Sequence, residues 1–530
     1  MTITDTERSI PAGTPADDGS ADARTGGPPP RPRPDATPAG TPIGHRAGVV
    51  AAFGVTTALS VATAIDPDLW WHLRTGEIIV DQGIPSVDTL SFTVAGTPWV
   101  THEWATQVAM WGVWSAGGAT ALILVFCAIV VAAYGMAFAT SRARPTTTAA
   151  VMVLAAATSM IATAPRPQML NLFCLALIIL ALERMRDGRL DARWIWAMPV
   201  LTTVWANLHS GYLTGVVVLG VYAVCERLEA RRAGGRAMPA AIVGRLPAVT
   251  AVAFVAAAAN PSGWHLWVYP FETLQSDAMR RYIVEWHSPD FHSPWFWPFV
   301  LLLTLTAVSM VASRRSPGWT PQMLVLGSAL AGMQSMRHIP LFAIIAIPVV
   351  AEQLDEALAR RRKGQPTTGR IARSAPVAVA VAGAGVIIAT MFVSSAVAIN
   401  DEAVAESYPE AAVDMIIASG LDTEPGFNAY QWGGYLIWRG LPVYIDGRAD
   451  VYGDEFMEWY FRAEDVEDGW RDPLDQPRVQ WALLAPDAEL GVMLDEVDDW
   501  TSIYDDGIAE LFYRCDGSAV PCPELATPEG

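Results

Sequence analysis

Apolar residues in this chain come in long runs and do not alternate with polar residues. Runs of this kind are typical of membrane-spanning α-helices, because about 20 helical residues cross a hydrocarbon layer of about 30 Å. The pattern predicts an α-helical polytopic membrane protein with about eleven transmembrane helices. The predicted spans are residues 47–65, 118–140, 147–164, 169–183, 195–208, 212–226, 247–260, 296–313, 322–337, 340–356 and 375–397.

Composition agrees with this prediction, since 52% of the 530 residues are hydrophobic and 21 are Trp. A soluble domain usually has less apolar character. The sequence has no Gly-rich phosphate loop, no Walker pattern and no GxSxG motif. Nucleotide-driven transport and serine hydrolysis therefore have no support from motifs.

Arginines indicate how the spans are oriented. They gather in the loops after the even-numbered spans, which read SRARP (141–145), ERMRDGR (183–189), ERLEARRAGGR (226–236), SRRSP (313–317) and ARRRKG (359–364). An excess of Arg and Lys marks the cytoplasmic side of a plasma membrane. With an odd number of spans, the N-terminus is expected inside and the C-terminus outside.

Three regions follow from these patterns. Residues 1–45, rich in Pro, Gly, Ala and Thr, bury too little apolar surface to fold and are expected to form a disordered cytoplasmic tail. Residues 46–397 form the multi-span domain, with outer loops at 66–117 and 260–295. Residues 398–530 are expected to form a small extracytoplasmic α/β domain.

Acidic residues concentrate in this last region. It has 30 Asp and Glu against 6 Arg, a net charge of −24 in a chain whose net charge is −19. Such acidity makes nucleic acid an unsuitable partner. Cys127, Cys174 and Cys225 lie in spans, whereas Cys515 and Cys522 flank a short loop. In an oxidising compartment the latter pair suits a disulfide, and two reduced thiols are the alternative.

Polar motifs gather on the outer side in the eleven-span arrangement. Seven of the eight histidines belong to these outward loops. The cytoplasmic loops contain little besides Arg, Ala and Gly. The outward motifs are IDPDLWWHLRTGE (65–77), THEW (101–104), APRPQ (164–168), NLHSGY (207–212), the long segment 260–294 and SMRHIP (335–340).

Ionisable groups beside hydrocarbon are costly to desolvate and usually mark a functional site. A simpler interpretation assigns Trp and His to the interfacial belt and Asp66 and Asp68 to a helix cap. The belt is the preferred interpretation of the tryptophans, and function is preferred for the carboxylates.

The first outer loop is expected to contain a surface helix over residues 69–82, whose first turn Asp68 caps. A hairpin is predicted over 91–101 and a second surface helix over 103–116. The loop 260–294 is rich in aromatic residues, suited to sugar stacking or to membrane anchoring.

In the acidic domain, two strands are expected within 436–453, a helix at 455–463, a strand at 479–486 and a hairpin over 500–515. The segment 446–450 suits either a turn with a local ion pair or a sugar-binding loop. The turn is the preferred interpretation.

The layout resembles the GT-C superfamily of membrane glycosyltransferases. The resemblance lies in a first span that ends in acidic residues (Asp66 and Asp68), a long first outer loop with two surface helices, many further spans and a soluble outer C-terminal domain. Members include protein mannosyltransferases, aminoarabinose transferases and the catalytic subunit of oligosaccharyltransferase. Many of these enzymes carry an adjacent Asp-Glu pair, where this chain has Asp-Pro-Asp and, further on, His-Glu.

The resemblance implies transfer of a sugar from a polyprenyl-phosphate donor to an extracytoplasmic acceptor, which is a glycan, lipid or protein. An acceptor hydroxyl needs a carboxylate general base, and the resemblance leaves open which of Asp66, Asp68 and Glu103 serves. The departing phosphate needs cationic donors. For this role the first choices are Arg166 and Arg337, with headgroup snorkelling as the alternative, and the next are Arg280 and Arg281.

Further residues are expected to line the substrate cavity. They are Trp71, His72, His102, Asn207, His209, Tyr212, Glu285 and His338. Glu103 and His102 suit two roles, which are to bind a divalent metal together with Asp66 or Asp68, or to orient the acceptor. Oxygen ligands suit Mg or Mn, and histidine favours Zn. The metal stays open, and packing is an alternative role for His209 and His338.

Two other functions stay open. A non-enzymatic transporter or flippase of a lipid-linked saccharide also needs outward polar residues, although a transporter should show ionisable or broken-helix features at mid-bilayer. A scaffold that displays the acidic domain would tolerate changes in both long outer loops.

Labelling tests the predicted topology. A cysteine introduced at residue 36 should be shielded from a membrane-impermeant thiol reagent in intact cells, and one at residue 420 should react, because the two positions are expected on opposite sides. Reaction at both positions would contradict the predicted arrangement.

Overall fold

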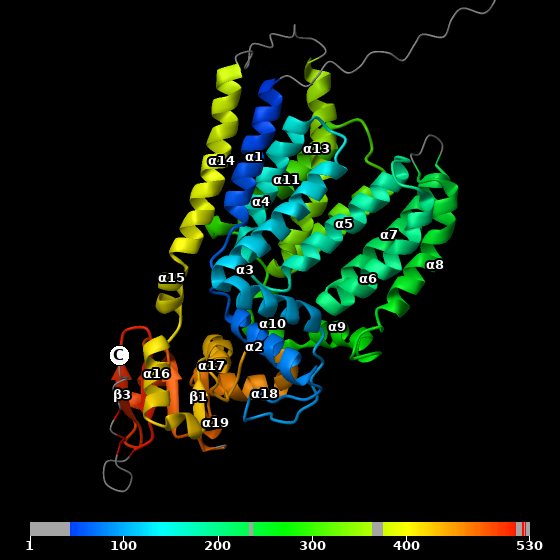
Figure 1. Cartoon of the computed structure of the whole chain (residues 1–530). Coiled ribbons are helices and arrows are strands. Elements are labelled where there is room, and N and C mark those ends of the chain that lie inside the picture. Colours follow the sequence, from blue (N-terminus) through cyan, green and yellow to red (C-terminus); the bar gives the residue numbers. More distant parts are fainter. Residues whose placement is uncertain are drawn as a thin grey trace, which may run out of the picture. The chain divides into compact units, whose positions relative to one another are not determined.

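The structure is a computed structural model, and it describes residues 43–232, 237–362, 375–476, 478–515, 522–523 and 525. The predicted N-terminal tail lies outside these residues, apart from positions 43–45, which begin the first helix. Figure 1 shows a mostly helical chain with a small sheet near its C-terminus.

A helix occupies each position where the apolar runs predict a span. These helices are α1 (Ile43–Ser60), α3 (Trp104–Thr140), α4 (Pro145–Ser159), α5 (Met169–Arg186), α6 (Ala197–Leu208), α7 (Tyr212–Ala230), α8 (Ala240–Ala256), α11 (Trp297–Ala312), α12 (Trp319–Gln334), α13 (Ile339–Arg362) and α14 (Ala375–Ala398). Four helical segments in the described residues are long and apolar enough to cross a membrane: Trp104–Thr140, Pro145–Ala162, Pro294–Ala312 and Ala375–Ala398. The larger span count stays a prediction.

Shorter helices make up the loops and the C-terminal region. They are α2 (Pro67–Gln82), α9 (His265–Gln275), α10 (Asp277–Tyr282), α15 (Asn400–Ser407), α16 (Glu410–Ala418), α17 (Gly433–Trp438), α18 (Ala449–Glu464), α19 (Asp472–Asp475) and α20 (Glu489–Asp495). Single 3₁₀ turns are η1 (Met160–Ala162), η2 (Ala192–Trp196), η3 (Val284–Trp286), η4 (Pro294–Phe296), η5 (Met336–His338), η6 (Leu421–Thr423) and η7 (Tyr430–Trp432).

The first loop after α1 differs in detail from the prediction. Helix α2 begins at Pro67, so Asp66, and not Asp68, is its N-cap. The surface helix predicted at 103–116 is continuous with the next span in α3, interrupted where Gly118 takes a positive φ of 58°. Residues 91–101 do not pair with one another as a hairpin. Val87 pairs with Pro98, and Ser91 pairs with Val443 of the C-terminal region.

The C-terminal region contains a four-stranded sheet in the order β1-β2-β4-β3. Strand β1 (Gly426–Asn428) runs parallel to β2 (Trp481–Leu484), which is antiparallel to β4 (Glu510–Tyr513). Strand β3 (Thr501–Asp505) completes the predicted hairpin with β4. The prediction of two strands within 436–453 is wrong: residues 436–438 end α17, and α18 starts at Ala449. Cys515 and Cys522 form a disulfide.

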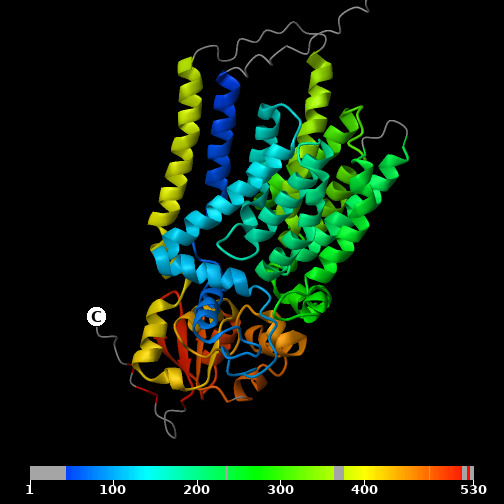
Figure 2. The same cartoon turned by 45° about the vertical axis from the view of Figure 1, so that its right-hand side comes forward.

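Helices α1 and α14 lie side by side in both views (Figures 1 and 2). A Cβ atom added to Gly54 would stand 2.1 Å from the carbonyl oxygen of Gly385, so the two backbones are in direct contact. Small residues permit this close approach between helices. Because α1 leads into Asp66 and α14 leads into the C-terminal region, their pairing brings these two segments together.

Hydrogen bonds and aromatic packing extend this contact. The side chain of Asn400 accepts a hydrogen bond from the Ala64 amide at 2.8 Å, and the Tyr408 hydroxyl donates to the Ile65 carbonyl at 2.8 Å. Trp70 of α2 is 4% exposed and packs edge-to-face on Tyr408 and Tyr435. Trp70 is therefore enclosed by protein, unlike the exposed tryptophans that suit an interfacial belt.

A fully buried ion triad joins the first loop to the C-terminal region. The Arg448 guanidinium donates to Asp446 at 2.7 Å and to Asp88 at 2.6 Å, and all three side chains are at most 1% exposed. The local pair with Asp446 agrees with the predicted turn. The bond to Asp88, 360 residues earlier in the chain, has no counterpart in the sequence pattern.

Replacing Arg448 tests the triad. Arg448→Met leaves two buried carboxylates without a counter-charge, so we expect the free energy of unfolding in detergent to fall by about 3–5 kcal/mol. The matched change Arg280→Met removes an exposed pair with Asp277 and should cost under about 1 kcal/mol. Equal losses in chemical denaturation of the two variants would contradict a stabilising role for the triad.

Candidate active site

A half-buried group of carboxylates surrounds the start of α2. Asp66 accepts a hydrogen bond from the Asp68 amide at 3.0 Å, which fixes its side chain at the helix N-terminus. Its other oxygen lies 3.3 Å from Arg166, a residue of the short segment between α4 and α5. The same guanidinium contacts Glu285 of η3 at 2.5 Å. Arg166, only 7% exposed, thus bridges two carboxylates from distant segments.

Asp68 belongs to the same group, but its carboxylate has fewer partners than that of Asp66. One of its oxygens accepts the indole N–H of Trp71 at 3.0 Å. Gly447 of the C-terminal region packs so closely that an added Cβ would stand 2.0 Å from this oxygen. A side chain at 447 would therefore displace the Asp68 carboxylate, and the C-terminal region forms part of the wall around Asp68.

These surroundings shift the pKa values of Asp66, Asp68 and Glu285 differently. Burial, together with the negative charge of the neighbouring Asp66, raises the pKa of Asp68 to about 7. Burial also raises the pKa of Asp66, although Arg166 opposes the shift. For Glu285 burial is outweighed by Arg166 and Arg337, which hold its pKa below the usual range.

A second buried group centres on Glu103, at the start of α3. Three imidazoles point their Nε2 atoms at its carboxylate: His209 at 3.1 Å, His102 at 3.3 Å and His72 at 3.6 Å. Burial opposes ionisation of Glu103, but the imidazoles hold its pKa well below the usual range. The carboxylate is therefore an anion with donors on three sides.

Hydrogen bonds at Nδ1 distinguish the three imidazoles. The Gly211 amide donates to Nδ1 of His209 at 2.8 Å, and the Gln107 amide nitrogen lies 3.2 Å from Nδ1 of His72. Each ring then has its proton on Nε2 and is neutral, and burial lowers the pKa of His209 to about 3 and of His72 to about 4. Nδ1 of His102 instead faces the Val100 carbonyl at 3.1 Å.

Both nitrogens of His102 face acceptors, which favours the doubly protonated form of the ring. Burial works against the charge, but Glu103 raises the pKa of His102 above its ordinary value. His102 and Glu103 therefore form a buried ion pair.

Helix α2 connects the two groups. Asp68 and His72 are four residues apart and so share a face of the helix, and the Trp71 ring packs on His72 with centroids 3.7 Å apart. Asp66 and Arg166 lie near the Asp68 end of this face, and Glu103 lies near the His72 end. The structure brings together nine of the predicted site residues, whose roles stay predictions: Asp66, Asp68, Trp71, His72, His102, Glu103, Arg166, His209 and Glu285.

Arg337 of η5 borders the site and, among the described residues, makes no ion pair. Its guanidinium stacks on Trp286, 5.0 Å from the ring centroid. The backbone beneath it is fixed by Ser335, whose hydroxyl donates to the Glu285 carbonyl at 2.9 Å. Arg337 also lowers the pKa of Glu285, which places its charge within electrostatic range of that carboxylate.

The remaining predicted residues have other surroundings. Asn207 accepts the indole N–H of Trp104 at 2.8 Å, and the Tyr212 hydroxyl donates to the Leu266 carbonyl at 2.9 Å, so both tie helices together. His338 is mostly enclosed, and burial lowers its pKa to about 4. Arg280 and Arg281 are exposed at 51% and 60% and pair with Asp277 and Glu467, away from Asp66.

Two further residues belong to the site. The ring of Tyr269 stacks on His102 with centroids 4.3 Å apart, and Asp450 of α18 is close enough to raise the pKa of His102. Burial raises the pKa of Asp450 itself. The sequence shows Tyr269 only as one of many loop aromatics and Asp450 as part of a turn, so neither had a signal that linked it to His102.

A metal site is not formed by these residues. Among the described residues, no group of three or more His, Cys, Asp or Glu side chains has the arrangement needed to hold a metal ion. The histidines around Glu103 turn their Nε2 atoms toward one carboxylate. A divalent metal, whether Mg, Mn or Zn, stays a prediction.

Solved structures resemble this chain over most of its length. One is the archaeal oligosaccharyltransferase AglB from Archaeoglobus fulgidus, in complex with an inhibitory peptide and a dolichol-phosphate. It has a TM-score of 0.54 and 10% identity over 83% of this chain and 69% of AglB. Another is ArnT from Cupriavidus metallidurans in the apo state, with a TM-score of 0.52 and 12% identity over 89% of this chain and 97% of ArnT.

The chain has the GT-C fold. No family model matches its sequence, and no curated protein does. At such low identity the likeness concerns the GT-C fold alone. The chemistry of this chain has to be inferred from its own side chains.

The ion pair of Glu103 and His102 predicts a pH-dependent stability. The raised pKa of His102 stabilises the fold below its unfolded pKa of about 6.5, and this stabilisation is lost as pH rises through the folded pKa. Glu103→Gln should therefore destabilise the protein by about 1–3 kcal/mol at pH 6 and by less at pH 9. Thermal unfolding in detergent at both pH values measures this, with the exposed Glu402→Gln as the control. A larger effect at pH 9 would rule out the imidazolium.

Proposed function

We propose that this protein is a membrane glycosyltransferase that moves a sugar from a polyprenyl-phosphate donor to an acceptor outside a bacterial plasma membrane. The observation that carries the proposal is the half-buried pair of Asp66 and Asp68 beside Arg166, with Arg337 nearby, on a GT-C fold. The AglB structure of the same fold holds a dolichol-phosphate, a lipid phosphate of the class proposed here.

Asp68 is the proposed general base. Asp66 is occupied by the Asp68 amide and Arg166, whereas Asp68 has one oxygen bound to Trp71 and the other without a hydrogen bond to the described residues. Its pKa of about 7 suits proton transfer near neutral pH. As the acceptor oxygen bonds to the anomeric carbon, its proton passes to Asp68.

The bond that breaks joins the anomeric carbon to the phosphate oxygen. The departing lipid phosphate keeps the electron pair and needs positive charge. Arg337 is the proposed phosphate-binding residue, because it stacks on Trp286 and makes no ion pair with a described residue. Arg166 is engaged by Asp66 and Glu285, and we assign it to holding the two carboxylates in place.

The second group is proposed to position the acceptor. Glu103, with the imidazoles of His72, His102 and His209, forms a rigid polar wall beside Trp71. Tyr269, stacked on His102, offers an aromatic face of the kind that packs on sugar rings. The eleven spans, the cytoplasmic N-terminus and the extracytoplasmic location of the acidic region 398–530 belong to the same proposal.

Substitution of the carboxylates tests the reaction. Asp68→Asn should lower transfer from a radiolabelled polyprenyl-phosphate sugar by about 10²- to 10⁴-fold, because an amide cannot accept the acceptor proton. Asp66→Asn should also reduce transfer by weakening the contact with Arg166, but less.

The control is Asp81→Asn, an exposed carboxylate on the same helix, which should keep full activity. Full transfer by folded Asp68→Asn would remove the proposed base, and a greater loss with Asp66→Asn would assign that role to Asp66. If the wild type moves the lipid-linked sugar across a vesicle membrane but does not transfer the sugar to an acceptor, the protein is a transporter, which is the alternative that the sequence left open.

A further inference from the structure

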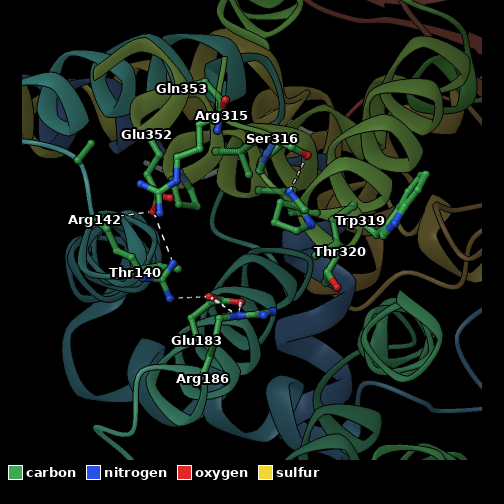
Figure 3. A pocket seen from close by; sticks show the side chains of 18 of the residues that line it. Thr140, Arg142, Glu183, Arg186, Arg315, Ser316, Trp319, Thr320, Glu352 and Gln353 are labelled. Atoms are coloured by element: carbon green, nitrogen blue, oxygen red, sulfur yellow. Dashed lines mark hydrogen bonds and ion pairs between the residues drawn. The ribbon is translucent and has the colours of Figure 1, made fainter. Parts of the chain in front are cut away.

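A cavity of about 580 Å³ lies far from the candidate active site. Its wall comes from the last turns of α5 and α7, the second half of α13 and the segment before α12. In Figure 3, Arg142, Glu183 and Arg186 occupy one side and Ser316, Trp319 and Thr320 another. Its size falls within the range of about 300–1,000 Å³ that small-molecule sites occupy.

The cavity lies at the opposite end of helices that begin at the active site. Helix α5 starts three residues after Arg166 and ends at Arg186. Its 18 residues span about 27 Å along the helix axis. This length approaches the thickness of the hydrocarbon layer. If Arg166 lies at one membrane boundary, the cavity lies at the other, at the level of lipid headgroups.

On part of the cavity wall, acidic and basic side chains pair with one another. Arg186 pairs with Glu226 at 2.6 Å and with Glu183 at 3.0 Å, and Arg142 pairs with Glu183 at 2.8 Å. The hydroxyls of Tyr222 and Thr320 donate to the same two carboxylates. The sequence prediction that this side contains little besides Arg, Ala and Gly missed this network.

Two buried acceptors in the wall lack such compensation. Glu229 is 7% exposed, receives only a 3.4 Å bond from the Trp319 amide and makes no ion pair with a described residue. It lies in the last turn of α7, where the helix dipole disfavours an anion. Gln353 is 3% exposed, and its Oε1 accepts no hydrogen bond from the described residues. Both side chains favour a ligand with N–H donors and positive charge.

The rim of the cavity is basic. Arg232 and Arg315 border the cavity, are exposed, and make no ion pair with a described residue. A ligand that satisfies both the acidic inner wall and the basic rim has an ammonium group inside the cavity and an anionic group at the rim. A bare metal ion does not meet this requirement, since no metal-binding group occurs among the described residues.

We propose that this cavity binds a phosphoethanolamine group, with its primary ammonium beside Glu229 and its phosphate toward Arg232 and Arg315. A primary ammonium has three N–H donors, which suits an inner wall that contains both the Glu229 carboxylate and the Gln353 amide oxygen. A headgroup of the adjoining lipid leaflet and a soluble phosphoethanolamine share this chemistry. The proposal stands independently of the transfer reaction.

Lipid retention tests the proposal. Full-length protein in detergent is given equal amounts of phosphatidylethanolamine, phosphatidylcholine and phosphatidylglycerol, and retained lipid is measured by native mass spectrometry. Phosphatidylcholine has a cationic group without N–H donors, and phosphatidylglycerol has no cation. We expect phosphatidylethanolamine to be preferred by about tenfold, a typical value for a charged hydrogen bond.

Variants assign the preference to the cavity. Glu229→Gln should abolish it, and Arg315→Gln, at the exposed rim, should weaken retention of phosphatidylethanolamine even if Glu229→Gln fails to fold. The exposed Glu496→Gln in the C-terminal region should behave as wild type. Equal retention of all three lipids, or an unchanged preference in both cavity variants, would overturn the proposal. A thermal shift with soluble glycerophosphoethanolamine but not glycerophosphocholine would identify the free group as a ligand.

Discussion

The candidate site depends on one buried cation. Arg166 lies between Asp66 and Glu285 and is almost without solvent contact. Charges removed from water are tolerated only with partners, and here each partner comes from a different segment of the chain. The guanidinium therefore fixes the end of the first span, the entry to α5 and the loop before α11 in one arrangement. Asp68 inherits its surroundings from that arrangement, and its raised pKa follows from burial beside a second carboxylate.

Closure of the site comes from the far end of the sequence. Contact between α1 and α14 at Gly54 and Gly385 brings the C-terminal region beside Asp66. The triad of Asp88, Arg448 and Asp446 then holds the first loop against that region, and Gly447 reaches the Asp68 carboxylate. A segment that by composition looks like a separate acidic domain thus supplies part of the wall around the proposed base.

Buried carboxylates at the two ends of the helical part have different partners. Around Glu103, the Nε2 atoms of three imidazoles face a buried anion. At the other end, Glu183 and Glu226 share Arg186, whereas Glu229 has no cation among the described residues. The first anion is surrounded by side chains of the protein, and the second is the one that we propose a ligand meets.

The sequence by itself determined the helices of the apolar runs, because hydrocarbon thickness sets a length that any such helix has to match. It also indicated that the acidic end of the first span, the histidines and Arg166 belong together, since short loops on one side of a membrane share one surface. Tertiary structure decided which charges meet. The pairing of Arg166 with Glu285, of Glu103 with His209 and of Arg448 with Asp88 links residues about 100 to 360 positions apart, and no local periodicity encodes such contacts. The same limit explains the wrong strands at 436–453, where an apolar run that suits a strand forms a helix because it docks on Pro67 and Trp71 of α2.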